Sequence, residues 1–344
     1  MKALVTGGGG FLGEAIVRAL RARGDEVRIL ARGDYPALRA LGAETVRGDL
    51  RDAAAVRAAC AGVDVVFHTA AKAGGWGPAA EYEAVNVKGT ANVIAGCRAA
   101  GVPALVHTSS PSVVHTGRAI EGGDESLPYG TRFTAHYPRT KAEAEKLVRA
   151  ASDERLRTIA LRPHFIWGPG DRHLLPRLLE RQRAGRMRRV GSGDPPTDTI
   201  YVDNCVHAHL LAADRLLAGA PLGGRVYFVS DGRPIGLWTM ADRLLEAAGA
   251  RPIRGTVPAW LAWTAGALLE GWHALIRDDR EPLMTRFGAS ELAHAQWFSI
   301  EAARRDLGYE PIVDREEGLR RLAAAFAGAA AWSTRTPQLE SSTS

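Results

Sequence analysis

The chain has 344 residues, enough to bury a large core as one α/β domain with an appended lobe. Its 44 lysines and arginines against 38 acidic residues give a net charge of +6, but the excess arginines are scattered along predicted helices and no nucleic-acid-binding module is present, which argues against a nucleic-acid partner. Three widely spaced cysteines, Cys60, Cys97 and Cys205, predict neither a metal site nor disulfides, so we expect reduced thiols and a cytoplasmic location.

The first predicted strand, residues 3–5, starts too early for a cleaved signal peptide to precede it. A glycine run follows, and apolar pairs at helical spacing after it predict a helix. Glycines at every third position let the turn close, let the backbone approach a pyrophosphate and let the helix pack on the strand. The free amides at the helix N-terminus would bind the phosphates. The residues predicted to hold a dinucleotide here are Gly7, Gly10, Phe11, Leu12 and Gly13.

A second strand, residues 26–31, ends at Ala31 and is followed by Arg32. The end of this strand faces the adenosine ribose in dinucleotide-binding folds, where an acid would bind the 2′-hydroxyl and an arginine a 2′-phosphate. Arg32 therefore predicts NADP(H) over NAD(H), the alternative being a surface side chain. After a short strand, residues 45–47, Asp49 and Leu50 continue the cofactor site, with Asp49 either capping the next helix or binding the adenine amino group.

The next apolar strand, residues 63–67, leads into a glycine-rich loop, residues 68–77, that should cover the cofactor with Ala70 and Lys72. A helix is expected over residues 79–100, with Asn86 on it, and then a fifth strand over 104–108. Residues 111–136 are expected to be irregular. A helix from Lys141 and a sixth strand over 156–161, ending near Pro163, complete an alternation that specifies a parallel sheet covered on both faces.

We therefore predict an α/β protein with a Rossmann doubly wound parallel sheet and a smaller, mainly helical C-terminal substrate lobe. The dinucleotide-binding domain spans 1–165, its sheet completed by later segments such as 197–230; an interleaved substrate lobe spans 166–332, and a disordered tail 333–344. The uncharged stretch 256–269, with Trp260, Trp263 and nearby Trp272, is too short to span a membrane comfortably. It is a buried helix, a lipid-facing lid or an interfacial helix making peripheral contact through 256–276.

Tyr137 and Lys141 are four residues apart, so a helix places both on one face. Carbonyl reduction needs a proton for the oxygen that gains charge, and a free tyrosine has a pKa near 10. A lysine ammonium beside it should lower that pKa toward the working range. Ser110 would donate a second hydrogen bond to the same oxygen, with Ser109 and Ser112 as competing choices.

Together, the glycine turn, Tyr137-x-x-x-Lys141, Thr108-Ser-Ser and Leu161-Arg-Pro resemble an extended short-chain dehydrogenase/reductase. Thr108-Ser-Ser-Pro-Ser-Val-Val and Gly168-Pro-Gly-Asp are similar to the 3β-hydroxysteroid dehydrogenase branch. Within it, Ala70-Ala-Lys-Ala-Gly-Gly-Trp-Gly, Phe165-Ile-Trp-Gly-Pro-Gly-Asp and Pro282-Leu-Met-Thr-Arg-Phe resemble bacterial 2-alkyl-3-oxoalkanoate reductases of long-chain olefin biosynthesis.

The resemblance implies NADPH-dependent reduction of the ketone of a long-chain 2-alkyl-3-oxoalkanoic acid. The resemblance implies that Tyr137 is the general acid, that Lys141 activates it and binds the nicotinamide ribose, and that Ser110 donates a hydrogen bond to the carbonyl. It also implies that Pro163 and His164 lie beside the nicotinamide. No metal is expected. The side chains considered for the reacting end and the substrate carboxylate are Lys72, Trp76, His115, His164 and Arg286, with a structural role as the default for His115.

Three other functions stay open: a 3β-hydroxysteroid or sterol dehydrogenase, an NAD-dependent sugar-nucleotide epimerase or dehydratase, and a non-catalytic NADP(H) sensor. A homodimer and an assembly with other olefin-pathway enzymes are further expectations.

Overall fold

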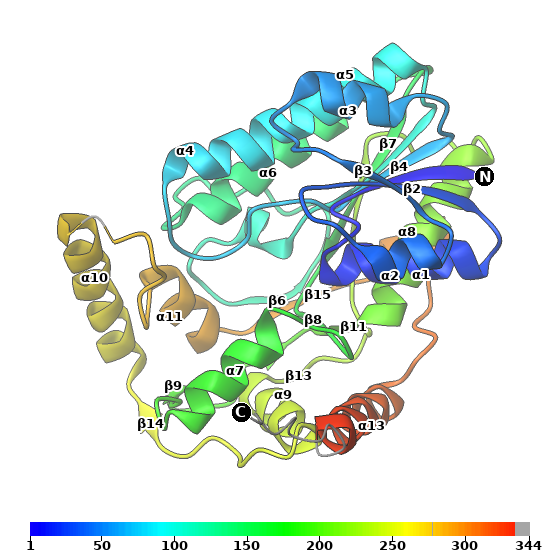
Figure 1. Cartoon of the computed structure of the whole chain (residues 1–344). Coiled ribbons are helices and arrows are strands. Elements are labelled where there is room, and N and C mark those ends of the chain that lie inside the picture. Colours follow the sequence, from blue (N-terminus) through cyan, green and yellow to red (C-terminus); the bar gives the residue numbers. More distant parts are fainter. Residues whose placement is uncertain (277, 334–344) are drawn as a thin grey trace, which may run out of the picture.

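A parallel seven-stranded sheet forms the centre of the computed structural model, which describes residues 1–276 and 278–333 (Figure 1). Its strands are β1 (Lys2–Thr6), β2 (Glu26–Ala31), β3 (Glu44–Arg47), β4 (Val65–His68), β5 (Ala104–Thr108), β7 (Arg157–Pro163) and β12 (Arg225–Val229). The spatial order is β12-β7-β5-β4-β1-β2-β3, and every neighbouring pair is parallel. The strand order reverses between β1 and β4, where this class of sheet binds its ligands. The predicted doubly wound sheet is confirmed.

Helices cover both faces of the sheet, because apolar residues on both sides of each strand need cover (Figure 1). One face packs against α1 (Phe11–Ala22), α2 (Pro36–Ala40), α8 (Val202–Leu217) and α12 (Glu301–Leu307). The other face packs against α3 (Ala53–Cys60), α5 (Gly89–Ala100) and α6 (His136–Ala150).

The helix predicted over 79–100 is present but not uniform. It comprises α4 (Ala79–Tyr82), a π-helical segment η1 (Glu83–Lys88) and α5. The buried Asn86 lies in the π segment, where its amide donates to the backbone oxygen of Lys72 (3.0 Å) and to Thr140 (3.0 Å). It also accepts from the Lys72 amide (2.7 Å). The irregular turn thus joins the loop after β4 to α6, in keeping with the occurrence of π segments at functional sites.

The remaining elements form a second layer beside the sheet. Its strands are β8 (Ile166–Trp167), β9 (Arg189–Val190), β10 (Pro196–Thr197), β11 (Ile200–Tyr201), β13 (Ile235–Gly236), β14 (Thr256–Val257) and β15 (Gln296–Phe298). Its helices are α7 (Leu174–Arg183), α9 (Leu237–Ala247), α10 (Ala259–Ile276), α11 (Arg286–Ala293) and α13 (Arg315–Ser333). A separate cluster of buried apolar side chains lies under these elements. In the predicted disordered tail, Ser333 ends α13 and residues 334–344 lie outside the described residues.

The stretch 111–136 is more ordered than expected. It contains a 3-10 helix, η2 (Pro111–Val114), and the strand β6 (Ile120–Gly123). β6 pairs in parallel with β15, so its partner lies far along the chain. A local pattern cannot predict such a strand, which explains the error.

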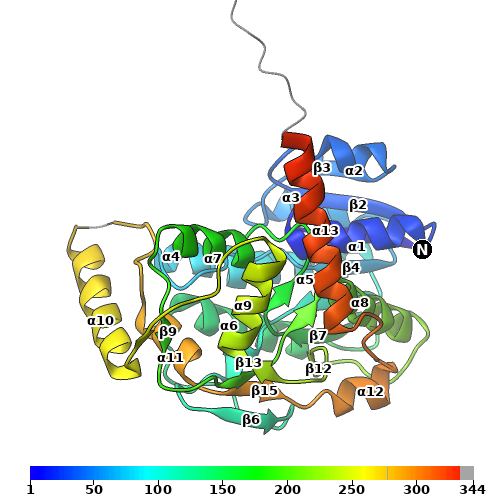
Figure 2. The same ribbon diagram turned by 90° about the horizontal axis from the view of Figure 1, so that it is seen from below.

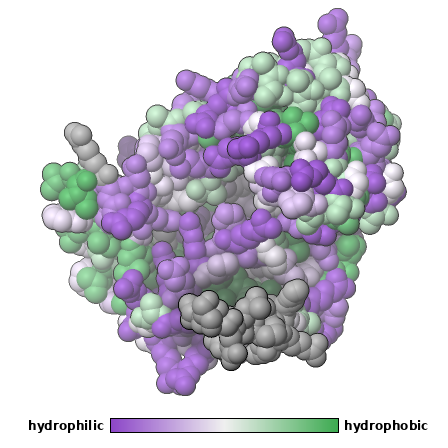
Figure 3. Space-filling model, in the orientation of Figure 1, coloured by the Kyte–Doolittle hydropathy of each residue, from purple (hydrophilic) through white to green (hydrophobic). Residues whose placement is uncertain are grey.

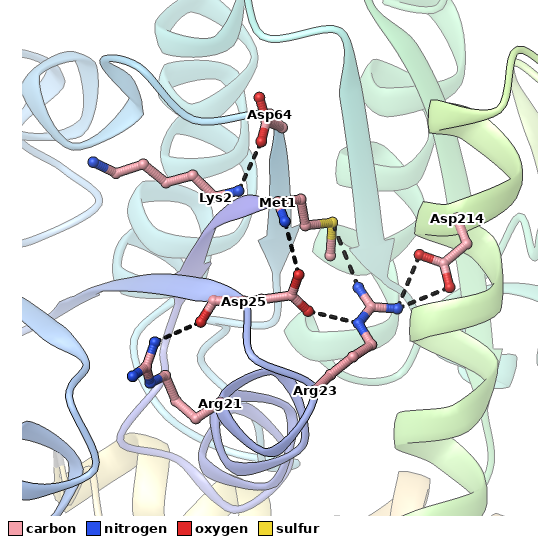
Figure 4. Close-up of polar contacts among 7 residues, drawn as sticks. All are labelled: Met1, Lys2, Arg21, Arg23, Asp25, Asp64 and Asp214. Atoms are coloured by element: carbon pink, nitrogen blue, oxygen red, sulfur yellow. Dashed lines mark hydrogen bonds and ion pairs between the residues drawn. The ribbon is translucent and has the colours of Figure 1, made fainter.

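Ionic contacts fix the start of β1 (Figure 4). The amino group of Met1 lies 2.8 Å from the carboxylate of Asp25, which also accepts from Arg23 at 2.6 Å. The same guanidinium makes two bonds to Asp214 on α8, at 3.0 and 2.9 Å. The first strand, the first helix and α8 are therefore tied together behind the glycine turn.

The helix α10 projects from one end of the molecule (Figures 1 and 2). It buries Ala262, Gly266 and Glu270, one stripe at four-residue spacing, against α11. Its other apolar side chains are exposed, including Trp260 (69 %) and Leu268 (70 %). Hydrophobic residues gather on this side of the surface (Figure 3). The alternative of a buried helix is therefore wrong. Across the described residues, no helix combines the length and apolar character that a membrane crossing requires.

Candidate active site

One cavity of about 830 Å³ lies at the carboxyl edge of the central sheet. Every residue predicted for the cofactor or the chemistry lines it: Gly7, Gly10, Phe11, Leu12, Gly13, Arg32, Asp49, Leu50, Ala70, Lys72, Ser110, Tyr137, Lys141 and Pro163. They come from the ends of six strands, the loops after them and the helices α1 and α6, so the fold collects side chains that the sequence separates.

The glycine turn has the geometry of a phosphate cradle. Gly7 has a positive φ of 72° and its amide donates to Leu30 O at 3.0 Å. A Cβ on Gly13 would lie 2.2 Å from Gly7 O, so α1 could not approach β1 as closely with any other residue there. No described side chain caps the N-terminus of α1, which leaves its first amides free toward the cavity. These features fit a bound dinucleotide pyrophosphate.

Two arginines flank Asp49 at the ribose end of the cavity. Arg32 is exposed and lines the cavity, and Arg51 binds both Asp49 oxygens at 2.9 and 2.7 Å. Hydrogen bonds from Arg51, with a smaller effect of the Arg32 charge, lower the pKa of Asp49 to about 2. Asp49 does not cap α3: Asp52 does, accepting from two helix amides at 2.9 and 3.1 Å. The capping alternative for Asp49 is therefore wrong.

At the other end, Tyr137 and Lys141 extend from α6 into the cavity beside Ser110. The hydroxyl of Ser110 lies 2.9 Å from that of Ser112, and both serines line the cavity. The ammonium of Lys141 donates to Thr108 O at 2.6 Å and lies 3.3 Å from His107 Nε2. The side chain of Lys141 is thus held by the end of β5.

The expected lowering of the Tyr137 pKa by Lys141 is wrong for this structure. Burial raises the pKa of Tyr137, the nearby hydroxyl of Ser110 opposes this, and the charge of Glu291 adds to it. Burial also lowers the pKa of Lys141 to about 8. Lys141 does not lower the Tyr137 pKa because its ammonium points to the backbone carbonyl of Thr108 in β5. Tyr137 is consequently a protonated acid throughout the neutral range.

A buried hydrogen-bond network engages the hydroxyl of Ser109, one of the three serines considered as the carbonyl donor. Ser109 donates to Glu145, whose carboxylate also accepts from Tyr129 at 2.7 Å. Arg162 makes two bonds to the same carboxylate, at 2.9 and 2.6 Å, and both charged side chains are at most 2 % exposed. Burial opposes the ionisation of Glu145, but the hydrogen bonds and charge of Arg162 outweigh it and lower its pKa. Ser109 is therefore committed to the protein, whereas Ser110 and Ser112 face the cavity.

Three of the four side chains considered for a substrate carboxylate are engaged elsewhere, whereas the fourth, His164, has no partner for its Nδ1 among the described residues. Lys72 pairs with Glu81 at 2.6 Å. Arg286 pairs with Glu270 of α10 at 2.6 Å. His115 lies 2.6 Å from the Gln296 amide, the structural role expected of it.

Burial lowers the pKa of His115 to about 4 and that of His164 to about 3, so both rings are neutral at pH 7. The indole of Trp76 donates to Asp278 O at 3.0 Å, away from the cavity. His164, in contrast, lines the cavity beside Pro163, as predicted.

Several cavity residues were not predicted. Tyr35 lies across the glycine turn, and a Cβ on Gly9 would lie 1.9 Å from its ring. Phe165 stacks on His164 at 4.2 Å and has a φ of 41°, a strained conformation for a non-glycine residue. Phe287 and Glu291 reach the cavity from α11. No local signal in the sequence marks the last two, since α11 reaches the site only through the tertiary fold.

The cavity joins a phosphate cradle to a protonated tyrosine, a lysine and a serine hydroxyl. Hydride transfer between a nicotinamide and a carbonyl or alcohol needs this combination of positioning and proton supply. The fold and the site thus define a nicotinamide-dependent oxidoreductase of the short-chain dehydrogenase/reductase type.

Comparison with known proteins narrows this class. Residues 4–257 match the model of the 3-beta hydroxysteroid dehydrogenase/isomerase family, and the chain belongs to that family. It is 50 % identical to a 2-alkyl-3-oxoalkanoate reductase of Stenotrophomonas maltophilia over 95 % of this chain and 100 % of that protein. A 2-alkyl-3-oxoalkanoate reductase of Shewanella oneidensis is 45 % identical over 94 % of this chain and 86 % of its own.

Among solved structures, MoeE5 in complex with UDP-glucuronic acid and NAD superposes with a TM-score of 0.74 at 25 % identity, covering 96 % of this chain and 100 % of that one.

Proposed function

We propose that the protein reduces the ketone of a long-chain 2-alkyl-3-oxoalkanoate to the 2-alkyl-3-hydroxyalkanoate, consuming one NADPH and one proton. The main support is the 50 % identity to a 2-alkyl-3-oxoalkanoate reductase over the whole length of that relative. The cavity agrees with it, since Ser110 and Tyr137 face the same space as the glycine turn.

A bound reduced nicotinamide supplies the hydride to the carbonyl carbon. Tyr137 holds a proton on its Oη at neutral pH, because its pKa is raised, and gives it to the carbonyl oxygen. Ser110 donates a hydrogen bond to the same oxygen, and Ser112, 2.9 Å away, orients that hydroxyl. Lys141, fixed on Thr108 O, presents its ammonium to the nicotinamide ribose.

NADPH is the proposed cofactor because two guanidiniums, those of Arg32 and Arg51, line the ribose end of the cavity. A 2′-phosphate gains charge-assisted hydrogen bonds from arginine. Asp49 would repel such a phosphate, but Arg51 neutralises its charge with two short bonds.

The helix α10 is proposed to guide the alkyl chains. Its tryptophans Trp260 and Trp263 line a second cavity of about 290 Å³ on the far side of α11 from Tyr137. The exposed apolar face of α10 also suits the lid and the peripheral lipid contact predicted for 256–276. We retain the division into a dinucleotide-binding domain over 1–165 and a substrate lobe over 166–332 as part of this proposal.

The homodimer, the assembly with other olefin-pathway enzymes and the cytoplasmic location stay predictions. So do the rival functions of a steroid dehydrogenase, a sugar-nucleotide epimerase or dehydratase, and a non-catalytic sensor.

The reverse reaction tests the proposal, because a β-oxo acid loses carbon dioxide too readily for simple assay. A long-chain 2-alkyl-3-hydroxy acid is offered with NADP⁺ and separately with NAD⁺, and reduced nicotinamide is followed by absorbance. A 3β-hydroxysteroid and a nucleotide sugar are run in parallel. We expect turnover of the hydroxy acid, faster with NADP⁺ and reduced by about 10²–10⁴-fold in Tyr137→Phe. Turnover of the steroid or the nucleotide sugar alone would replace the assignment and keep the fold.

A further inference from the structure

The helix α11 separates the two cavities and presents a carboxyl group to the larger one. Phe287 and Glu291 are one turn apart and line the cavity that holds Tyr137. Arg286, Ser290 and Ala293, on other faces of the helix, line the smaller cavity. Glu291 acts electrostatically on Tyr137, whose pKa its charge raises. The carboxyl therefore faces the reacting end of the site.

Within the described residues, Glu291 has no compensating partner. Burial is the influence that shifts its pKa, raising it to about 7, and neither an ion pair nor a hydrogen bond offsets it. The side chain is only partly buried, so cavity water solvates the carboxyl until a ligand displaces it. A group that faces a substrate cavity without a protein partner points to a partner on the ligand.

The proposed substrate carries a carboxylate one carbon from its ketone, which places it within a few ångströms of Ser110 and Tyr137. Among the side chains considered for that carboxylate, Lys72 and Arg286 are committed to Glu81 and Glu270. Lys141 is held on a backbone oxygen. Two ionised carboxylates in so confined a space repel each other, so one of them takes up a proton.

We propose that Glu291, in its neutral form, donates a hydrogen bond to the carboxylate of the β-oxo or β-hydroxy acid and so selects substrates with an acid group next to the reacting carbon. The inference rests on the proposed function. An O–H donor to a carboxylate makes one of the stronger hydrogen bonds in proteins. Ionisation of Glu291 removes the donor and adds repulsion, so binding weakens about tenfold per pH unit once the carboxyl is ionised.

The other titratable groups around Glu291 decide how far the pH dependence of binding can be assigned to Glu291. His115 and His164 are neutral above about pH 4, and Tyr137 stays protonated. Lys141, with a pKa of about 8, has lost about half of its charge at pH 8. The remaining charged or titratable groups on or beside α11 each have a partner: Arg286 pairs with Glu270, Arg189 pairs with Asp242, and the ring of His294 lies against Ser290 O. His173, directly before α7, also lines the cavity. Between pH 6 and 8 both Glu291 and Lys141 therefore change charge, and a variant without the Glu291 carboxyl identifies the part of the pH dependence that belongs to Glu291.

The test measures binding rather than turnover. A long-chain 2-alkyl-3-hydroxy acid is titrated into the protein with NADP⁺ by calorimetry from pH 6 to 8, in two buffers of different ionisation enthalpy. The wild type should bind more weakly as the pH rises above 7 and should take up close to one proton per ligand at pH 8. The matching secondary alcohol without a carboxyl group should bind independently of pH.

Two variants serve as matched controls. Glu291→Gln keeps an N–H donor but cannot titrate at this position, so its affinity should fall much less from pH 6 to 8, and the proton uptake that belongs to Glu291 should disappear. Glu291→Asp keeps the titration and should retain the pH dependence; unfolding temperatures report whether both variants fold.

pH-independent binding in the wild type, or a pH dependence and proton uptake that are unchanged in Glu291→Gln, would overturn the inference and leave the proposed reaction intact. Failure of the wild type to bind or oxidise the hydroxy acid at any pH would overturn both.

Discussion

Replacing Glu145 by Gln should strongly destabilise the protein. The carboxylate accepts two bonds from Arg162, at 2.9 and 2.6 Å, where both side chains are at most 2 % exposed. The amide keeps the shape but leaves a guanidinium buried without its counter-charge, which costs about 3–5 kcal/mol. For 344 residues the entropy of unfolding is about 0.7 kcal/mol per degree, so the unfolding temperature should fall by about 4–7 °C.

The assay is thermal and urea unfolding at several pH values. The pKa of Glu145 is lower in the folded protein than its ordinary value, so its ionised form stabilises the fold at neutral pH. This stabilisation is lost as the pH falls through the folded-state pKa, and the gap between wild type and Glu145→Gln should narrow there.

The double variant Glu145→Leu with Arg162→Met removes both charges and should lose less stability than the sum of the two single variants. A loss below about 1 kcal/mol in Glu145→Gln at pH 7, or strict additivity in the double variant, would refute the reasoning.

Three further predictions concern the site. Arg32→Asp should raise the KM for NADPH at least about tenfold, because a charge-assisted bond is lost and repulsion is added, while the KM for NADH changes little. An unchanged ratio of the two KM values would contradict the proposed preference for NADPH. Lys141→Met should be almost inactive yet more stable by up to about 3 kcal/mol at pH 7, since burial lowers the Lys141 pKa to about 8. That cost of a buried ammonium fades in the wild type as the pH rises from about 8 to 10.5, so the two unfolding curves should converge there. Replacing Trp260 and Trp263 by Ser should raise the KM more for long-chain than for short-chain hydroxy acids; equal effects at all chain lengths would exclude a role of α10 in binding the chains.

The sequence by itself determined the features that are local in the chain. Alternation of apolar strands and helices specified a parallel sheet and six of its seven strands, and β2 begins and ends where its pattern predicted. The spacing of Gly7, Gly10 and Gly13 indicated the cradle because Gly10 and Gly13 both pack against Gly7 O within the same turn, whereas the close approach of Gly7 to Ala70 is a contact of the tertiary fold. Tyr137 and Lys141 could be paired because a helix brings residues four apart onto one face.

Only the tertiary structure decided which partner each polar group takes. Ser109 and Ser110 are neighbours in the chain and both line the cavity, yet the hydroxyl of Ser109 donates to Glu145 and that of Ser110 lies against Ser112. Whether Arg286 was a free cation depended on Glu270, one helix away. Burial raises the Tyr137 pKa, and the ammonium of Lys141, turned toward β5, does not lower it as expected.

Glu291 reaches the reacting end of the cavity only because α11 packs across that end. The residues next to Glu291 in the chain do not show which other elements it will lie near. Burial and ion pairing are properties of the packed molecule, and they set the charge of each group. The sequence therefore predicted many of the residues that gather at the site, and the packing added others and decided which of them is charged, committed or free to meet a ligand.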